Sequence, residues 1–488
     1  MAKRTPSSSS LGLLTLLATI TVCKFHVPGM CSNNDDDQTR NNLEKFPVSR
    51  VEPGSSSPPD YSTLFATAPT TTPSGRVYGV TSYGADPSGE EDSTGAIMEA
   101  IRDALDGPSE GFLFAGIRNL GGARVDLQGG TYVVSRPLNF PLPGRGNLII
   151  HGGTLKASEN FPAEGYLLDL SPTTSGGGQA YNYEFITFKD LLLDSNFRGG
   201  GIQVVHSLRI GIDNCYITHF TTNGILVRGG HETYIRNSFL GQHITAGGDP
   251  DERNFTGTAI DLSGNDNAVT DVVIFSAQVG VAVSGQANLL SGVHCYNKAT
   301  GFGGTGIYVK VPGNTQTRIV NCYMDYTGIV AEDPVQLHVS NSFFLGDAFV
   351  ELKSVRGTIA GINIVDNMFA GSGKGIDIVQ LDQKLAPFKD VERVVVERNN
   401  VRGMNLKSTV GMGWARGNGT TWTVDLDRVL LFPNLATFVQ YTFKSSENSF
   451  PKHVLRNTSD NRVVIESDMP VTAEVFVMVD QSKSSVIN

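Results

Sequence analysis

The sequence has few of the residues that charge, cross-link or anchor a protein. Only 18% of its 488 residues are Asp, Glu, Lys or Arg, and the net charge is −10. An acidic chain disfavours nucleic acid as a partner, and an anionic polymer would need locally placed cations. The 5 cysteines show no C-x2-C spacing, so no metal ligand set is predicted. No apolar run is long enough to predict a membrane helix.

The N-terminal region carries the pattern of export. A basic start precedes an apolar run from Leu11 to Val22, which is too short to cross a bilayer. We therefore expect residues 1–30 to be a signal peptide and the protein to be secreted. Residues 31–75 are rich in Ser, Thr, Pro, Asn and Asp and are expected to be a disordered lead-in. Three glycosylation sequons are compatible with this route, at Asn254, Asn418 and Asn457.

A short phrase returns along the middle of the chain: Gly, an apolar residue, any residue, and another apolar residue. Clear copies read Gly201-Ile202-Gln203-Val204, Gly224-Ile225-Leu226-Val227, Gly280-Val281-Ala282-Val283, Gly306-Ile307-Tyr308-Val309 and Gly375-Ile376-Asp377-Ile378. A second phrase, usually opened by Asn, precedes most copies at a period of about 26 residues. Short β-branched strands between Gly and Asn turns, repeated at this period, predict a β-solenoid.

The chain outside the repeats predicts a cap at each end. Ala96 to Leu105 is amphipathic, with Asp92 or Ser93 as N-cap, and we expect this helix to cover the first coil of a solenoid spanning 76–403. Residues 404–488 lose the period and alternate as antiparallel strands do, which predicts a small C-terminal β-rich module.

Two segments resemble landmarks of a known superfamily. Tyr83-Gly84-Ala85-Asp86-Pro87, followed by Asp92-Ser93-Thr94, resembles the opening signature of the pectate-lyase-like β-helix superfamily, and Gly129-Gly130-Thr131-Tyr132 resembles its next landmark. The chain is most similar to secreted plant polygalacturonases of the QUARTET type. The resemblance implies an all-β, right-handed, single-stranded parallel β-helix that hydrolyses α-1,4 galacturonosyl links of pectin in the cell wall.

The catalytic positions that this resemblance implies are not occupied by acids. In the polygalacturonase pattern they fall at Gly257-Thr258, at Gln278-Val279 and, for a histidine, at Thr305. None of these side chains can act as acid or base. Either the catalytic acids occupy other positions in this sequence, or the chain is not a standard hydrolase.

Outward side chains of a parallel β-helix stack in rows about 4.8 Å apart. The phrase predicts two rows. The first is Gln203, Leu226, Asp261, Ala282, Tyr308, Val330, Glu351 and Asp377, and the second is Val205, Arg228, Ser263, Ser284, Lys310, Glu332, Lys353 and Val379.

Acids on or just before these strands are the candidate catalytic residues, because glycoside hydrolysis uses two carboxylates. They are Asp325, Glu332, Asp347 and Glu351, with Asp261 as an earlier alternative. Outward groups that could contact a uronate chain are Arg228, Tyr308, Lys310, Lys353 and Asp377. A solvated polar face without chemistry remains the alternative interpretation.

The polar repeat position is assigned to structure. Asn214, Asn237, Asn321, Asn341 and Asn367 are expected to hydrogen-bond along the turns, with His294 in the same place. Cys295 and Cys322 follow that position on neighbouring coils, so a disulfide between them is possible.

Three functions remain open. The first is an inverting hydrolase without cofactor, a monomer acting on polygalacturonate. The second is a lyase using Lys353 or Lys310 as base, which alone would require Ca²⁺. The third is a wall polysaccharide binder without catalysis.

Overall fold

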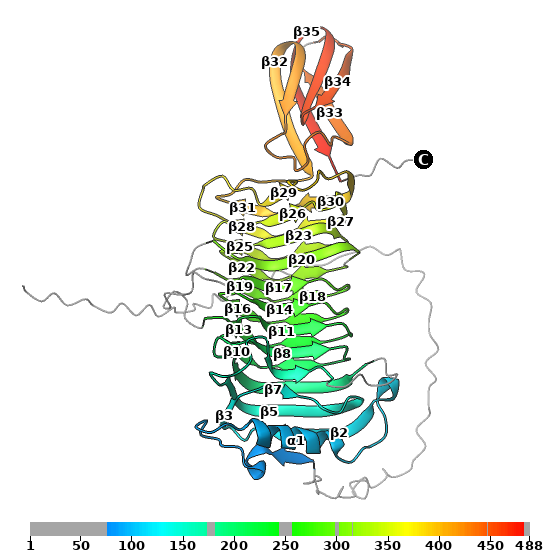
Figure 1. The fold of residues 1–488 in the computed structure, drawn as a ribbon. Coiled ribbons are helices and arrows are strands. Elements are labelled where there is room, and N and C mark those ends of the chain that lie inside the picture. Colours follow the sequence, from blue (N-terminus) through cyan, green and yellow to red (C-terminus); the bar gives the residue numbers. More distant parts are fainter. Residues whose placement is uncertain are drawn as a thin grey trace, which may run out of the picture. The chain divides into compact units, whose positions relative to one another are not determined.

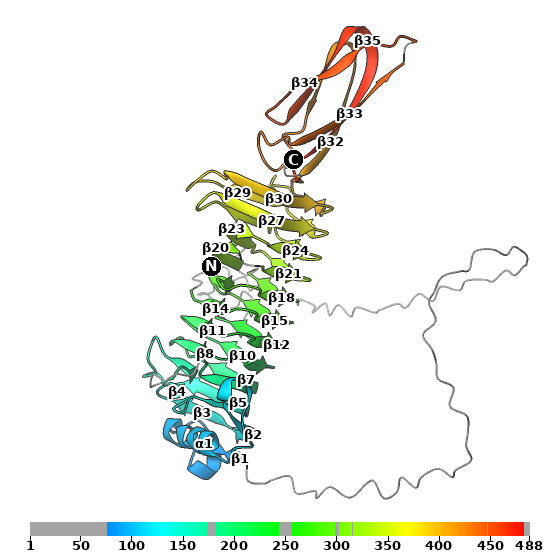
Figure 2. The same ribbon diagram turned by 90° about the vertical axis from the view of Figure 1, so that its right-hand side faces the viewer.

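The computed structural model describes residues 76–172, 181–243, 256–297, 302–314, 316–446 and 448–482. These form a parallel β-helix followed by an antiparallel sheet, as Figure 1 shows and Figure 2 repeats from the side. The expectation of an all-β parallel β-helix is confirmed. The predicted signal peptide and lead-in fall in residues 1–75, outside the described residues. No helix among the described residues is long and apolar enough to cross a membrane.

The parallel strands form three faces, and most coils contribute one strand to each. Face 1 carries the Gly-Ile-x-Val phrase and consists of β4 (Leu138–Asn139), β6 (Tyr166–Leu170), β8 (Gly200–Val205), β11 (Asn223–Arg228), β14 (Thr258–Leu262), β17 (Val279–Val283), β20 (Thr305–Asn314), β23 (Ile329–Val335), β26 (Val350–Lys353) and β29 (Val379–Asp382).

Faces 2 and 3 follow face 1 along the chain in each repeat. Face 2 consists of β1 (Val77–Gly79), β2 (Arg118–Asp126), β5 (Arg145–Ala157), β7 (Tyr183–Asp194), β9 (Gly211–Asp213), β12 (Tyr234–Arg236), β15 (Ala268–Thr270), β18 (Leu289–Ser291), β21 (Arg318–Val320), β24 (His338–Ser340), β27 (Thr358–Val365) and β30 (Asp390–Glu397). Face 3 consists of β3 (Thr131–Val134), the ends of β5 and β7, β10 (Tyr216–Thr218), β13 (Phe239–Gly241), β16 (Val273–Phe275), β19 (His294–Tyr296), β22 (Tyr323–Asp325), β25 (Phe343–Leu345), β28 (Met368–Ala370) and β31 (Asn400–Arg402).

Apolar residues of the repeat stack inside the coils. Ile225 pairs with Ile202 on one side and Ile260 on the other, and Ile260 pairs in turn with Val281. These side chains are fully buried in one continuous core. Because strand side chains alternate, burying these residues forces the residue between them outward, and this alternation positions the candidate site.

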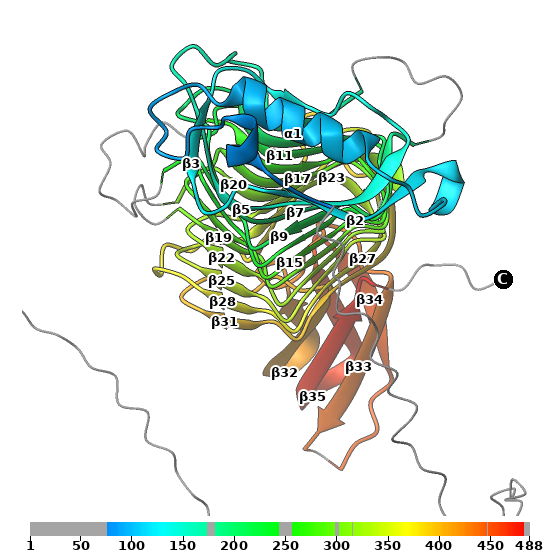
Figure 3. The same cartoon turned by 90° about the horizontal axis from the view of Figure 1, so that it is seen from below.

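A helix covers the first coil, as predicted. Helix α1 (Thr94–Asp106) runs across the end of the coils in Figure 3 and buries Ile97, Ala100 and Ile101. Ser93 is the N-cap residue, but the capping bond comes from Asp92, whose Oδ1 accepts a hydrogen bond from the Thr94 amide at 3.0 Å. Two short 3₁₀ turns, Val80–Tyr83 and Phe114–Gly116, flank this helix in the chain.

The polar repeat position lies at the corner between faces 2 and 3. Asn214, Asn321 and Asn341 have φ of 52°, 56° and 51° there, in the left-handed region that asparagine tolerates. Gly292 occupies this corner in the coil where the prediction placed His294. That prediction is wrong, because His294 lies two residues further on, in β19, paired with Tyr323.

The possible disulfide between Cys295 and Cys322 is not formed. The register pairs Cys295 with Met324, so the two cysteines are offset along the strand rather than stacked. Cys215, Cys295 and Cys322 are all free and buried. Burial raises the pKa of Cys215 to about 12, so its thiol stays protonated.

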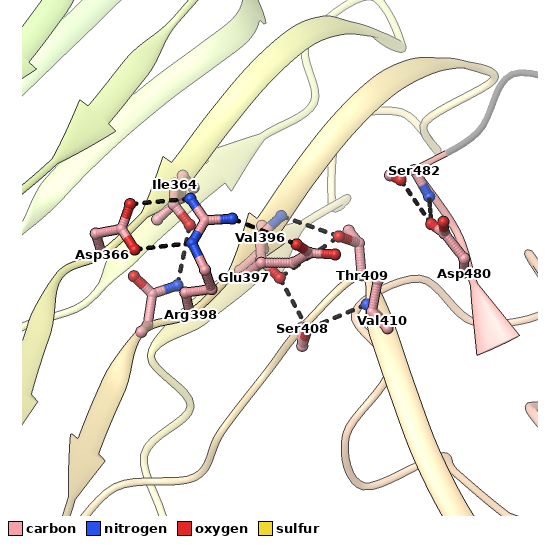
Figure 4. Close-up of polar contacts among 11 residues, drawn as sticks. Ile364, Asp366, Val396, Glu397, Arg398, Ser408, Thr409, Val410, Asp480 and Ser482 are labelled. Carbon is pink, nitrogen blue, oxygen red and sulfur yellow. Dashed lines mark hydrogen bonds and ion pairs between the residues drawn. The ribbon is translucent and has the colours of Figure 1, made fainter. Parts of the chain in front are cut away.

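The antiparallel sheet has its own core and is tied to the last coil. It consists of β32 (Val410–Asp425), β33 (Phe438–Ser445), β34 (His453–Ser459) and β35 (Arg462–Asp480), and all pair with β35. Figure 4 shows the junction, where the Ser408 hydroxyl donates to the Val396 carbonyl at 2.8 Å and the Val396 amide donates to Thr409 Oγ1 at 3.0 Å. Leu431 and Phe432 join the solenoid core and so close its last coil.

Candidate functional site

The outward side of face 1 carries the two predicted rows over most of its length. In the first row, Asp261 pairs with Ala282, then Tyr308, then Val330, then Glu351. The last member is wrong: Glu351 pairs with Gln380, while Asp377 forms an isolated bridge with Asn405 and accepts a hydrogen bond from its amide at 2.9 Å.

The second row places opposite charges on successive coils. Lys310 pairs with Glu332, Glu332 with Lys353, and Lys353 with Asp382. Val379, predicted to end this row, instead pairs with Val350 and is buried. Asp382 is therefore an acid of this face that the sequence pattern missed, because the strand starts at Val379 and not at the Gly375 phrase.

Glu332 is the centre of a polar cluster. Its Oε1 accepts hydrogen bonds from the Tyr308 hydroxyl at 2.5 Å and from the Lys353 ammonium at 2.9 Å. Lys310 Nζ lies 4.9 Å from the centre of the Tyr308 ring. Burial alone would raise the pKa of Glu332, but the bonds from Tyr308 and Lys353 outweigh it and leave the pKa below its usual value. Glu332 is thus held as a carboxylate.

Glu351 has the opposite tendency. Burial raises its pKa, and the negative charge of Asp382 on the next coil raises it further. Glu351 and Glu332 lie on neighbouring coils and two residues apart along the strand. A coil spacing of about 4.8 Å and two residues of about 3.3 Å each put their Cα atoms about 8 Å apart. The protonated form is therefore favoured at Glu351, and the ionised form is favoured at the neighbouring Glu332.

Asp261 occupies a separate part of the same face. Burial raises its pKa, while Lys310 and Arg228 lower it. It lies four coils from Glu351 along the first row, or about 19 Å. Asp261 and Glu351 therefore cannot act on the same glycosidic bond.

Tyr166 reaches the part of the face that holds Asp261. Its hydroxyl donates to Asn223 Oδ1 at 2.8 Å, and the charges of Arg228 and Asp261 both act on it. Tyr166, Asn223, Arg228 and Asp261 thus form a polar region of face 1, in which Arg228 is the cation. The sequence pattern did not single out Tyr166 or Asn223, which lie ahead of the repeated phrase.

The remaining two predicted acids lie elsewhere. Asp325 is in β22 on face 3, where it pairs with Tyr296 and Leu345. Asp347 lies in the turn after β25 with φ of 66°, and its Oδ1 and Oδ2 accept hydrogen bonds from the amide and hydroxyl of Ser372, both at 2.7 Å. Burial raises the pKa of Asp347, but the bonds from Ser372 outweigh it and lower that pKa. We interpret Asp347 as an acceptor that fixes a turn.

The positions of the implied polygalacturonase set do stack on face 1. Thr258 pairs with Val279, and Val279 pairs with Thr305, on three successive coils. None of the three carries a titrating side chain, so chemistry on this face depends on acids at other positions. Within the described residues, no cluster of three or more His, Cys, Asp or Glu is placed to hold a metal ion.

A parallel β-helix with paired carboxylates on its outer face defines a class, that of the pectate-lyase-like proteins. Residues 77–329 match the family described as rhamnogalacturonase A/epimerase, pectate lyase-like. The chain belongs to this family. It is 65% identical over 417 residues to polygalacturonase QRT3 of Arabidopsis thaliana. The matched region covers 85% of this chain and 86% of that protein.

Solved structures are similar to this chain at low sequence identity. The endo-xylogalacturonan hydrolase from Aspergillus tubingensis is 11% identical, with a TM-score of 0.50 over 68% of this chain and 95% of that one. The A-module of the mannuronan C-5 epimerase AlgE6 from Azotobacter vinelandii is 13% identical, with a TM-score of 0.43 over 67% of this chain and 98% of that one.

Proposed function

We propose that this protein is a secreted cell-wall polygalacturonase that hydrolyses α-1,4 galacturonosyl links of pectin with inversion. The observation that carries the proposal is the pair Glu351 and Glu332, whose pKa values are shifted in opposite directions on neighbouring coils. A pair of titratable groups pushed apart in this way supplies an acid and a base at one pH. The high identity to a relative named polygalacturonase supports the substrate class.

In this mechanism Glu351 is the general acid. Its raised pKa keeps a proton available for the glycosidic oxygen as the bond to C1 breaks. Glu332 takes a proton from the water that attacks C1 from the opposite side of the ring. With Cα atoms about 8 Å apart, the two outward side chains can place their carboxyls about 6.5–9.5 Å apart, the separation that inverting enzymes use to admit this water. Both carboxyls return to their starting states when protons exchange with solvent.

The cations of face 1 have a binding role. Lys310 and Lys353 lie beside Glu332, and Arg228 lies at the Asp261 end of the same face. A galacturonate chain laid along the coils brings one carboxylate per sugar, and each can pair with such a cation. On a chain of net charge −10, these local cations offset the general repulsion of a polyanion.

The state of Lys353 favours hydrolysis over elimination. The hydrogen bond to Glu332 raises the pKa of Lys353, and burial lowers it only in part. A lysine that takes a proton from C5 of a uronate must be neutral, and so needs a lowered pKa. Lys353 is held in its charged form, which suits ion pairing.

The test is a product analysis of the secreted protein on polygalacturonate, with and without a chelator. We expect new reducing ends, no ultraviolet absorbance from an unsaturated uronide, and no effect of the chelator. Unsaturated product that the chelator abolishes would establish a Ca²⁺-dependent lyase. Binding to the polymer without product of either kind would establish a binder.

A further inference from the structure

One surface of the C-terminal sheet is apolar and exposed. The sheet packs one face on its own core, where Trp422 is 3% exposed and Val475 is fully buried. On the other face, Met412, Trp414 and Phe476 are 72%, 64% and 45% exposed. Large exposed apolar side chains that gather on one face mark a binding surface more often than scattered ones do.

The strand register brings these residues together. Trp414 on β32 is directly opposite Phe476 on β35, and Met412 is opposite Met478 in the next row. Side chains opposite each other in an antiparallel sheet have Cβ atoms about 4.5–5.5 Å apart. A hollow of about 630 Å³ lies over this part of the sheet and is lined in part by Met412 and Phe476. Trp414 and Phe476 thus lie opposite each other on two adjacent strands, and we call the surface that they form the platform.

The ring faces of this platform are uncovered. Among the described residues, neither Trp414 nor Phe476 packs against another aromatic ring. The aromatic column on the outside of face 3 differs, because Tyr216 and Phe239 stack there with their centres 4.4 Å apart and cover each other's faces. The platform on the C-terminal sheet can therefore receive a flat apolar ligand face.

Cations border the platform on one side. Arg416 and Lys444 both lie opposite Glu474, in the row next to Trp414 and Phe476. Their charged atoms are 3.6 Å and 3.7 Å from the Glu474 carboxylate, and both side chains are mostly exposed. Such exposed pairs are weak, so the two cations can turn to another anion. Arg416, Lys444 and Glu474 together carry a net charge of one positive unit.

The rest of this part of the chain does not repel a polyanion. Residues 404–488 contain eight Lys or Arg and eight Asp or Glu, so they add nothing to the net charge of −10. A pyranose ring presents C–H groups on one side, which pack on an aromatic ring, and a uronate adds a carboxylate at its edge. The platform and its bordering cations match both features.

We propose that the outer face of β32 and β35 is a second, non-catalytic binding surface for pectic polyuronate. Trp414 and Phe476 stack on sugar rings, and Arg416 and Lys444 pair with their carboxylates. The choice of a polyuronate rests on the proposed function. The surface itself shares no residue with the Glu332 and Glu351 pair, so it holds the enzyme on insoluble wall polymer without taking part in bond cleavage.

The chain offers a direct reporter of this surface. It has 2 tryptophans, and both lie in β32: Trp414 is on the outer face and Trp422 is in the core. We expect polygalacturonate to change Trp414 emission saturably and to protect it from acrylamide. The Trp414→Phe variant should show neither effect. Higher ionic strength should weaken binding, because the ion pairs lie at the surface.

Variants separate binding from cleavage. Trp414→Ala and Phe476→Ala should each weaken retention on insoluble pectin about tenfold, with unchanged turnover of short soluble oligogalacturonates. Phe450→Ala is the matched control, because Phe450 is fully exposed in the connection between β33 and β34. Asn418 lies two positions beyond Arg416, so the titration is repeated after removal of any N-glycan.

Each remaining outcome decides the proposal. Unchanged Trp414 emission at saturating polygalacturonate, with hydrolysis intact, would overturn the binding surface alone. A dimer that Trp414→Ala dissociates, without any response to polymer, would identify a contact between copies of this chain and would also overturn it. Binding through Trp414 in a protein that releases no product would uphold this surface and reject the proposed hydrolase.

Discussion

Glu332 and Glu351 lie on adjacent coils of face 1, and Lys353 lies directly opposite Glu332, two residues beyond Glu351 on the same strand. Lys353 and Tyr308 stabilise the charged form of Glu332, whereas burial and Asp382 favour the protonated form of Glu351. The ion pair with Lys353 thus favours ionised Glu332, while burial and the charge of Asp382 favour protonated Glu351 on the next coil.

The first prediction concerns stereochemistry. If the two carboxyls lie about 6.5–9.5 Å apart, a water molecule fits between them, and cleavage of an α-linked substrate should release the β-anomer first. Proton NMR of fresh product in the first minutes checks this. Initial release of the α-anomer would require a covalent intermediate and would contradict the assignment of Glu332 as base.

The second prediction is the pH profile. Activity should fall at low pH as Glu332 gains a proton at its lowered pKa, and at high pH as Glu351 loses its proton at its raised pKa. The optimum should therefore lie between the two pKa values, one below and one above the ordinary glutamic acid value of 4.5. Initial rates on polygalacturonate across the acid range test this, and a profile with no alkaline limb would be inconsistent with Glu351 as acid.

The third prediction links the raised pKa of Glu351 to stability. A carboxyl with a raised pKa in the folded state contributes stability below its unfolded pKa, and that contribution is lost as pH rises through the folded pKa. Glu351→Gln removes this loss, so its melting temperature should exceed that of the wild type at neutral pH and approach it at low pH. Thermal melts at both pH values measure it. An equal difference at both would point to a packing effect.

The fourth prediction isolates the hydroxyl of Tyr308. In Tyr308→Phe the bond to Glu332 is lost, so the pKa of Glu332 should rise and the acidic limb should move to higher pH. The loss at the optimum should stay below the loss of about 10²-fold expected on removing the acid itself. A shift of the alkaline limb instead would assign Tyr308 to Glu351.

The fifth prediction contrasts two adjacent phenylalanines in β25. Phe344 is fully buried and stacks on Phe369 with ring centres 4.4 Å apart, whereas Phe343 is 44% exposed. Phe344→Ala should lower the free energy of unfolding by about 3–5 kcal/mol. Phe343→Ala should cost clearly less. Denaturant unfolding of both variants provides the comparison, and a larger loss in Phe343→Ala would mean that β25 has the opposite orientation.

The sequence predicted the strands well and the turns poorly. The Gly-Ile-x-Val phrase assigned the outward positions of Tyr308, Lys310, Glu332, Glu351 and Lys353 correctly, because alternation along a buried strand leaves no other choice. It failed where a turn changes length. The Gly375 phrase precedes its strand, so Asp377 was misplaced and Asp382 was missed.

The acids near strand ends show a second limit of prediction from the sequence. Asp325 and Asp347 come just before face 1 strands in the sequence, but one belongs to face 3 and the other binds Ser372 across a turn. Sequence distance to a strand does not reveal which face a side chain joins when three faces share each coil. The pKa shifts of Glu332 and Glu351 likewise depend on neighbours from the coils before and after.

The most direct test of the central claim is the rate of reducing-end release from polygalacturonate by Glu351→Gln, measured beside Asp325→Asn. The account predicts a loss of at least about 10²-fold for Glu351→Gln, because an amide cannot donate the proton, and little change for the face 3 variant. An unchanged rate in Glu351→Gln, or a large loss confined to Asp325→Asn, would contradict it.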